Sequence, residues 1–289
     1  MTLASFLEAQ CLRMDLWPGA PPGERGPALE EHAVPEGAVG GIDVPVIEVY
    51  RPPEPNGSAL LILGGGGYRH IQMVRESNPA ANLALSLGMT AVILKHRLPI
   101  DGWKPLAPLQ DAQRALRLIR KNAAAWGIAN ERIGVLGFSA GGHLAAMLST
   151  RFDLETYAAI DDTDWLSARP DFAALLFPVI SLEPPFEFTA TKRMLSRDDA
   201  GADQLQRYSP HRLVTAAVPP TFLAHAADDK VAPPEHSILM FQALKAASVS
   251  AELHIFPTGG HGSATGAQGS RFHLWQTLFS SWVEPWLRD

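Results

Sequence analysis

Short apolar runs alternate with longer amphipathic stretches along most of this 289-residue chain. The six clearest runs are typical of buried strands and lie at residues 59–63, 90–96, 132–138, 172–180, 221–226 and 251–256. Helical patterns accompany them at residues 78–87, 108–126, 238–247 and 272–287. This alternation predicts an α/β protein with a mostly parallel central sheet and helices on both of its faces.

The beginning of the chain has a different pattern. From Trp17 to Pro55 it is rich in proline and glycine and contains one apolar run, Val44 to Tyr50. We interpret residues 1–55 as an N-terminal arm packed on a catalytic domain of residues 56–289, with the apolar run as an edge strand. Within that domain, the polar segment 181–215 is expected to form a small helical excursion near the site.

Charge and cysteine content narrow the range of partners. A formal net charge of −6 argues against nucleic acid and anionic membranes, because both attract clustered cations. The single cysteine, Cys11, cannot form an intrachain disulfide. We find neither a signal peptide nor an apolar run of ~18 residues, so a cytoplasmic location is expected. The sequence leaves the oligomeric state open.

The residues that directly follow each strand are the first candidates for a functional site, since ligands of such sheets bind beyond the carboxyl ends of the strands. After the strand at 132–138 the chain reads Gly-Phe-Ser-Ala-Gly at residues 137–141, followed by an alanine-rich helix. A serine on so tight a strand-to-helix turn has strained backbone angles, so residues two positions away must lack side chains. This context indicates that Ser139 is a nucleophile.

A second glycine cluster follows the strand at 59–63. Gly64 to Gly67 precede Tyr68, and such a run exposes backbone N–H groups where an acyl-transfer enzyme needs oxyanion donors. A phosphate-binding loop is the competing interpretation, but no Lys-Ser/Thr pair follows the glycines.

An acid and a base follow the last two strands. Asp228 and Asp229 come after residues 221–226, and His261 lies in a glycine-rich loop after residues 251–256. The order serine, aspartate, histidine is that of an α/β-hydrolase. The spacing alone favours neither aspartate. No metal-binding motif appears, so we expect no metal and no cofactor.

Together these segments resemble the α/β-hydrolase esterases of the acetyl-xylan-esterase-like family, also called xylanase-associated acetylesterases. The similarity extends over almost the whole chain, at residues 16–23, 64–68, 94–99, 108–120, 132–146, 169–182, 219–237 and 252–262.

The resemblance implies roles for individual residues. Ser139 would be the nucleophile and His261 the base, and the family's Gly-x-x-Asp-x-x-Val-Pro pattern assigns the acid to Asp229. The same comparison assigns the oxyanion hole to the amides of Gly66, Gly67 and Ala140. Two positions depart from the pattern. Gly64 stands where relatives carry proline or histidine, and Ser263 stands where a larger apolar residue is common. The smaller, polar Ser263 is expected to enlarge or polarise the pocket mouth.

The predicted function is therefore that of a serine esterase for short acyl groups, with a small ester, such as an acetylated oligosaccharide, as its substrate. An amide hydrolase, either a peptidase or a formamidase, and a carboxylesterase for longer acyl chains use the same catalytic groups. A non-catalytic binding protein on the same scaffold is the alternative from another class.

Overall fold

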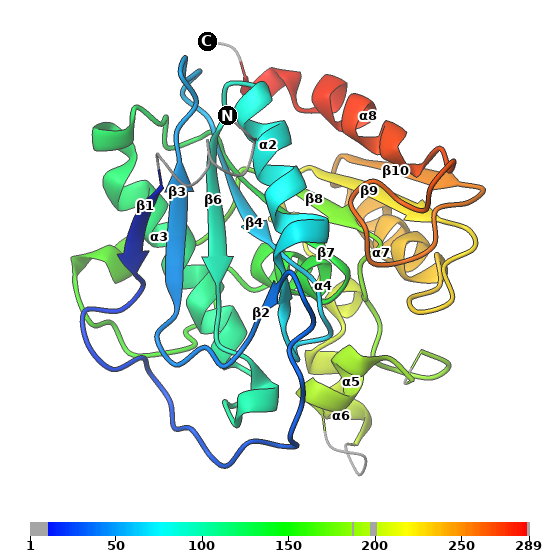
Figure 1. Ribbon diagram of the computed structural model, residues 1–289, viewed down its shortest axis with the longest axis horizontal. Coiled ribbons are helices and arrows are strands. Elements are labelled where there is room, and N and C mark those ends of the chain that lie inside the picture. The colour runs from blue at the N-terminus through cyan, green and yellow to red at the C-terminus, as the bar shows by residue number, and fades with distance from the viewer. Residues whose placement is uncertain (1–10, 187, 197–200, 288–289) are drawn as a thin grey trace.

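A computed structural model describes residues 11–186, 188–196 and 201–287. Its centre is an eight-stranded sheet in the order β1-β3-β6-β4-β7-β8-β9-β10 (Figure 1). Strands β6 to β10 are mutually parallel with β4, whereas β3 is antiparallel to both of its neighbours. The strands are β1 (Leu12–Asp15), β3 (Val46–Tyr50), β4 (Ala59–Leu63), β6 (Thr90–Lys95), β7 (Ile133–Phe138), β8 (Phe172–Leu176), β9 (Thr221–Ala226) and β10 (Ala251–Phe256). The predicted mostly parallel sheet is thus confirmed.

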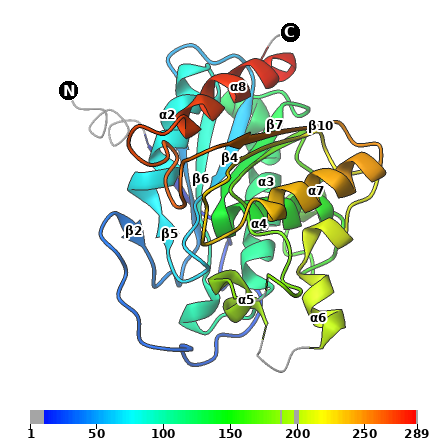
Figure 2. The same ribbon diagram turned by 90° about the vertical axis from the view of Figure 1, so that its right-hand side faces the viewer.

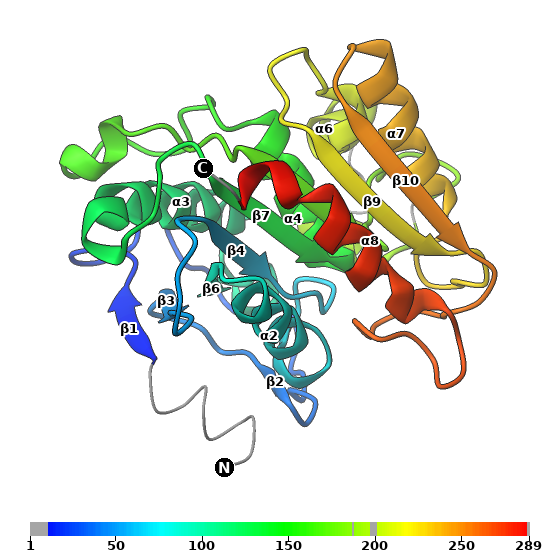
Figure 3. The same cartoon turned by 90° about the horizontal axis from the view of Figure 1, so that it is seen from above.

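Helices cover both faces of this sheet (Figure 3). The main helices are α2 (Asn78–Ser86), α3 (Ala107–Trp126), α4 (Ser139–Thr150), α7 (Glu235–Ala246) and α8 (Trp275–Trp282). Side chains of α3, α4 and α7 share one buried cluster with alternate sheet residues such as Leu61 and Leu63. Leu60 and Ile62 point to the other face, where they join α2 and α8. Because neighbouring strand residues enter different clusters, both faces of the sheet are buried and its central strands are apolar throughout.

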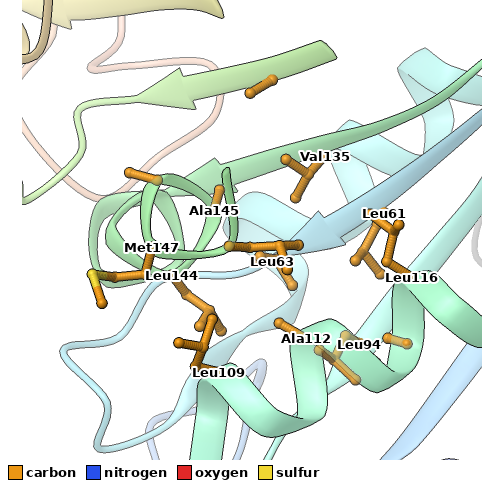
Figure 4. Packing of buried hydrophobic residues seen from close by; sticks show 14 of the residues in the cluster. Leu61, Leu63, Leu94, Leu109, Ala112, Leu116, Val135, Leu144, Ala145 and Met147 are labelled. Atoms are coloured by element: carbon orange, nitrogen blue, oxygen red, sulfur yellow. The ribbon is translucent and has the colours of Figure 1, made fainter. Parts of the chain in front are cut away.

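The packing of α3 explains the first of these clusters (Figure 4). Leu109, Ala112 and Leu116 lie on one face of the helix and meet the side chains of Leu61 and Leu63. The helix ends at Gly127, whose φ of 69° allows its N–H to bond back to the carbonyls of residues 123 and 124.

Two predicted strands differ from the observed ones. The run at 44–50 is not an edge strand, because β1 pairs with the outer side of β3. The run at 172–180 stops at Leu176, since Phe177 has a positive φ of 35° and Pro178 lacks an N–H for the ladder. The predicted helix at 272–287 is α8 flanked by two short 3₁₀ turns, Phe272–Leu274 and Glu284–Trp286.

The segment 181–215 contains two short helices, α5 (Ala190–Leu195) and α6 (Ala202–Arg207), and a 3₁₀ turn, Pro210–Arg212. In Figure 1 the β6 arrow points toward the end of the molecule at which α5 and α6 lie, and Figure 2 shows the same end from the side.

A small two-stranded sheet of β2 (Ala38–Val39) and β5 (Ile71–Gln72) completes the fold, followed by a π-helical turn, Met73–Ser77, and a 3₁₀ turn, Pro99–Asp101. A further 3₁₀ turn spans Asp162–Trp165. No helix in the described ranges is long and apolar enough to cross a membrane.

Candidate active site

Ser139 occupies the sharp turn between β7 and α4. Its φ is 51°, a left-handed conformation that few residues with side chains adopt. A Cβ atom on Gly137 would lie 2.1 Å from the carbonyl oxygen of Gly141, and one on Gly141 would lie 2.1 Å from that of Leu63. Both glycines are therefore required for the turn, and the strain that they permit exposes the serine to the end of the sheet.

Three predicted residues form one chain of hydrogen bonds. The Ser139 hydroxyl lies 2.8 Å from Nε2 of His261, and Nδ1 of the same ring lies 2.6 Å from Oδ2 of Asp229. Burial raises the pKa of Asp229, but hydrogen bonds from His225 and His261 outweigh it and hold this pKa well below its usual range. Asp229 is therefore a carboxylate over the whole neutral pH range.

The charge of Asp229 determines the tautomer of His261. A carboxylate only accepts hydrogen bonds, so Nδ1 of His261 carries the ring proton. Nε2 is then free to accept the proton of the Ser139 hydroxyl. The second oxygen of Asp229 accepts the N–H groups of Val231 and Ala232, at 2.8 and 2.9 Å, which fixes the carboxylate in place. The arrangement can act as a general base on the serine.

The two aspartates, which spacing left equivalent, have different contacts. Asp228 Oδ1 accepts the N–H groups of Gly259 and Gly260, both at 2.9 Å, so this side chain holds the loop that carries His261. Of the two aspartates, Asp229 is the one hydrogen-bonded to the imidazole of His261. The structure therefore brings Asp229, and not Asp228, together with the serine and the histidine.

The glycine loop lies beside the serine. Gly66 and Gly67, with φ of 124° and 65°, line the same cavity as Ser139. Neither of their N–H groups donates a hydrogen bond within the part of the chain that the structure describes. Ala140 is the second residue of α4, where helical N–H groups have no acceptor in the helix. These three amides are thus available for an anionic oxygen.

The structure shows what surrounds Gly64 and Ser263, the two positions that depart from the family pattern. A side chain at Gly64 would meet Ser77 Oγ at 2.6 Å and the Gln72 carbonyl oxygen at 2.8 Å, so only glycine fits here. Ser263 forms a hydrogen bond of 3.2 Å with the hydroxyl of Thr265.

A cavity of about 420 Å³ opens over these groups. This volume is in the range of small-molecule sites. Its wall has a polar part, which includes Arg69, His70, Gln72, Arg75 and Glu76, and an apolar part. The apolar part comprises Val179, Ala190 and Val231.

Two buried residues at this site were missed from the sequence. His225 donates from Nε2 to the Ala232 carbonyl oxygen at 2.7 Å and lies 3.3 Å from Asp229 Oδ2. Glu76 is 1% exposed and lines the cavity. His225 stands inside an apolar strand, four residues before Asp229, and Glu76 belongs to no motif, so only the folded structure reveals their neighbours.

Within residues 11–186, 188–196 and 201–287, no group of three or more histidine, cysteine, aspartate or glutamate side chains is arranged to bind a metal ion.

The chain is similar in sequence to several known proteins. The model of the family described as BD-FAE matches residues 47–244, about two thirds of the chain. Endo-1,4-beta-xylanase B of Butyrivibrio fibrisolvens is 30% identical over 228 residues, which are 76% of this chain and 35% of that protein. Acetylxylan esterase of Xylanibacter ruminicola is 28% identical over 221 residues, 75% of this chain and 43% of that protein. The chain therefore spans less than half the length of these curated relatives.

Among solved structures, an acetyl ester-xyloside bifunctional hydrolase from Caldicellulosiruptor lactoaceticus superposes with a TM-score of 0.77 at 35% identity. The match covers 92% of this chain and 97% of that one. Similarity over nearly the full length of both chains extends the relationship to the whole fold.

Proposed function

The chain belongs to the BD-FAE family of α/β-hydrolase-fold esterases, and from this membership we propose that it hydrolyses short acyl esters, in particular acetyl esters of carbohydrates. The observation that carries the proposal is the hydrogen-bonded chain of Ser139, His261 and Asp229 at the edge of the cavity. The names of the relatives, an acetylxylan esterase and an acetyl ester-xyloside hydrolase, support the acetyl group and the sugar.

In the proposed mechanism, His261 Nε2 removes the proton of the Ser139 hydroxyl as Oγ attacks the ester carbonyl carbon. The negative charge on the carbonyl oxygen is stabilised by the amides of Gly66, Gly67 and Ala140. The imidazolium, stabilised by Asp229, then protonates the leaving alcohol. Water repeats the sequence on the acyl-enzyme, which releases the acid and restores the serine.

The test is Ser139→Ala assayed with 4-nitrophenyl acetate. We expect loss of turnover, since the variant lacks the hydroxyl that is hydrogen-bonded to His261, while the unfolding temperature stays close to that of the unmodified protein. Ser149→Ala is the matched control, because Ser149 lies in the same helix and its hydroxyl donates to the Ala145 carbonyl oxygen. Retained turnover in Ser139→Ala contradicts the assignment.

The substrate class is tested separately with nitrophenyl esters of increasing acyl length and with an acetylated xylo-oligosaccharide. Activity that falls from acetate to octanoate, with turnover of the oligosaccharide, supports the proposal. Activity that rises toward octanoate identifies a carboxylesterase for longer chains, and preference for a formyl or aminoacyl amide identifies an amide hydrolase. Failure of a fluorophosphonate to label Ser139 identifies a binding protein.

A further inference from the structure

Glu76 is a buried carboxylate that the mechanism above does not use. It lies in the π-helical turn Met73–Ser77, between the glycine loop and α2, and its side chain is almost fully enclosed. Its Oε2 atom accepts the N–H of Gly65 at 2.6 Å. Gly65 directly precedes the two glycines to which we assign the oxyanion amides, so Glu76 holds the base of that loop.

The carboxylate also lies close to the nucleophile. A Cβ atom on Gly65 would be 2.8 Å from Glu76 Oε2 and 2.9 Å from the Cβ atom of Ser139. The two side chains therefore flank the same glycine. Glu76 lines the cavity together with Ser139 and His261, which places the carboxylate at the site where a substrate reacts.

The other oxygen of this carboxylate is available to a ligand. Oε1 accepts no hydrogen bond from the residues that the structure describes, although the side chain is buried. Buried acceptors without donors are costly, and a bound molecule with hydroxyl groups removes that cost.

We propose that Glu76 has two tasks: Oε2 positions the oxyanion loop through Gly65, and Oε1 binds a hydroxyl group of the alcohol part of the substrate. The ligand class is a polyhydroxylated alcohol, such as a sugar with a free hydroxyl near its ester. The inference rests on the proposed esterase function and deepens it, because it names the residue that selects a sugar ester over a simple one.

The protonation of Glu76 is compatible with this role. Burial raises its pKa to about 7, against the opposing effects of the Gly65 N–H, His261 and Arg75. A sugar hydroxyl both donates and accepts, so it can pair with the carboxylate and with the carboxylic acid alike.

The two tasks are separated by the variant Glu76→Gln. Its one amide oxygen is expected to keep the bond to the Gly65 N–H, since the reverse orientation would set NH₂ against N–H. An NH₂ group then replaces the acceptor that faces the cavity. We expect the loss of kcat/KM to be about tenfold larger for an acetylated xylo-oligosaccharide than for 4-nitrophenyl acetate, with the difference mainly in KM.

The variant Glu76→Ala removes both tasks and is expected to lower kcat for both substrates, because the loop loses its anchor. Glu131→Gln, an exposed glutamate outside the cavity lining, is the control and should change neither. Unfolding temperatures of all variants identify any loss of folded protein.

Equal losses on the two substrates in Glu76→Gln would overturn hydroxyl recognition. Unchanged 4-nitrophenyl acetate hydrolysis in folded Glu76→Ala would overturn the positioning task. Failure of the proposed function itself is a different result, since the unmodified protein would then hydrolyse neither ester.

Discussion

Two buried aspartates with basic partners occupy different regions of the molecule. Asp229 contacts His261 and His225 at the carboxyl ends of β9 and β10. Asp111, on α3, pairs with Arg97, and both side chains are fully buried. Asp111 accepts hydrogen bonds from Trp17 Nε1 and from the backbone N–H and the guanidinium of Arg97.

The cluster around Asp111 and the cluster around Asp229 differ in whether one of their polar groups faces a cavity. The Arg97 guanidinium donates to Asp111, to Gln110 and to the Pro22 carbonyl oxygen, so this cluster is closed within the protein and ties the N-terminal segment to α3. The cluster of Asp229 ends at the Ser139 hydroxyl, which faces the cavity. Burial and ion pairing therefore do not by themselves mark a catalytic site; an open end at a cavity does. Substitutions in the first cluster should reduce stability, and substitutions in the second should reduce turnover.

The largest expected effect is that of Asp229→Asn on turnover. The asparagine oxygen can keep the bonds to the Val231 and Ala232 N–H groups, while its NH₂ group faces His261. Nδ1 must then accept, the ring proton moves to Nε2, and the imidazole can no longer take the serine proton. We expect a loss of roughly 10⁴-fold in kcat for 4-nitrophenyl acetate. A variant that keeps a tenth of the activity would contradict the assignment.

Asp111→Asn should lower the unfolding free energy and leave the turnover per folded molecule nearly unchanged. Both carboxylate oxygens of Asp111 accept hydrogen bonds from N–H groups of Arg97. An NH₂ group at this position would therefore face an N–H donor. The Arg97 charge would stay buried without its carboxylate partner. Breaking a buried pair in this way costs about 3–5 kcal/mol of unfolding free energy. Thermal and urea unfolding measure the loss. Active-site titration with a fluorophosphonate then gives kcat per folded molecule, which should remain near that of the unmodified protein.

The comparison also shows what could be read from the sequence. The strands at 59–63 and 221–226 have their predicted bounds, because fully buried parallel strands are largely continuous apolar runs. The strand at 251–256 also has its predicted bounds, although it lies at the edge of the sheet and is only partly buried. Strand β1 was missed, since its residues are largely exposed and its conformation depends on pairing with β3.

The same contrast holds for the site. Ser139 and His261 follow strands in glycine-rich turns, so their positions were predictable from local pattern. His225 and Glu76 were not, because their roles depend on which residues the fold places against them. Asp229 contacts His225 across four residues of sequence, but Glu76 meets Gly65 through a turn that carries no motif.

A third prediction concerns the stability of the closed polar network around His143. Burial lowers the pKa of His143 to about 4, and its ring contacts the Tyr68 hydroxyl and the Tyr208 carbonyl oxygen. Between pH 6.5 and about 4 the unfolded chain binds a proton at this histidine that the folded protein does not, so stability falls as the pH falls. From pH 7 to pH 5 this residue should cost about 2 kcal/mol.

The measurement is urea unfolding at both pH values for the unmodified protein and for His143→Gln. His236, whose pKa burial lowers to about 3, adds a similar dependence in both proteins. The variant should therefore lose less stability on acidification by about 2 kcal/mol. Equal pH dependence of the two proteins would show that His143 does not contribute.

The smallest effect is expected at Asp228, and it tests the choice between the two adjacent aspartates. Asp228 is exposed and uses one oxygen, Oδ1, to accept the N–H groups of Gly259 and Gly260. Asp228→Asn keeps that acceptor, so kcat should stay within about threefold of the unmodified value. Asp228→Ala removes both bonds from the loop of His261 and should lower kcat about fivefold, as the loss of about 1 kcal/mol of positioning implies. Because the side chain acts on the loop and not on the imidazole, the pH profile of kcat should keep its shape in both variants. A loss in Asp228→Asn that exceeds the loss in Asp229→Asn would reverse the assignment of the acid.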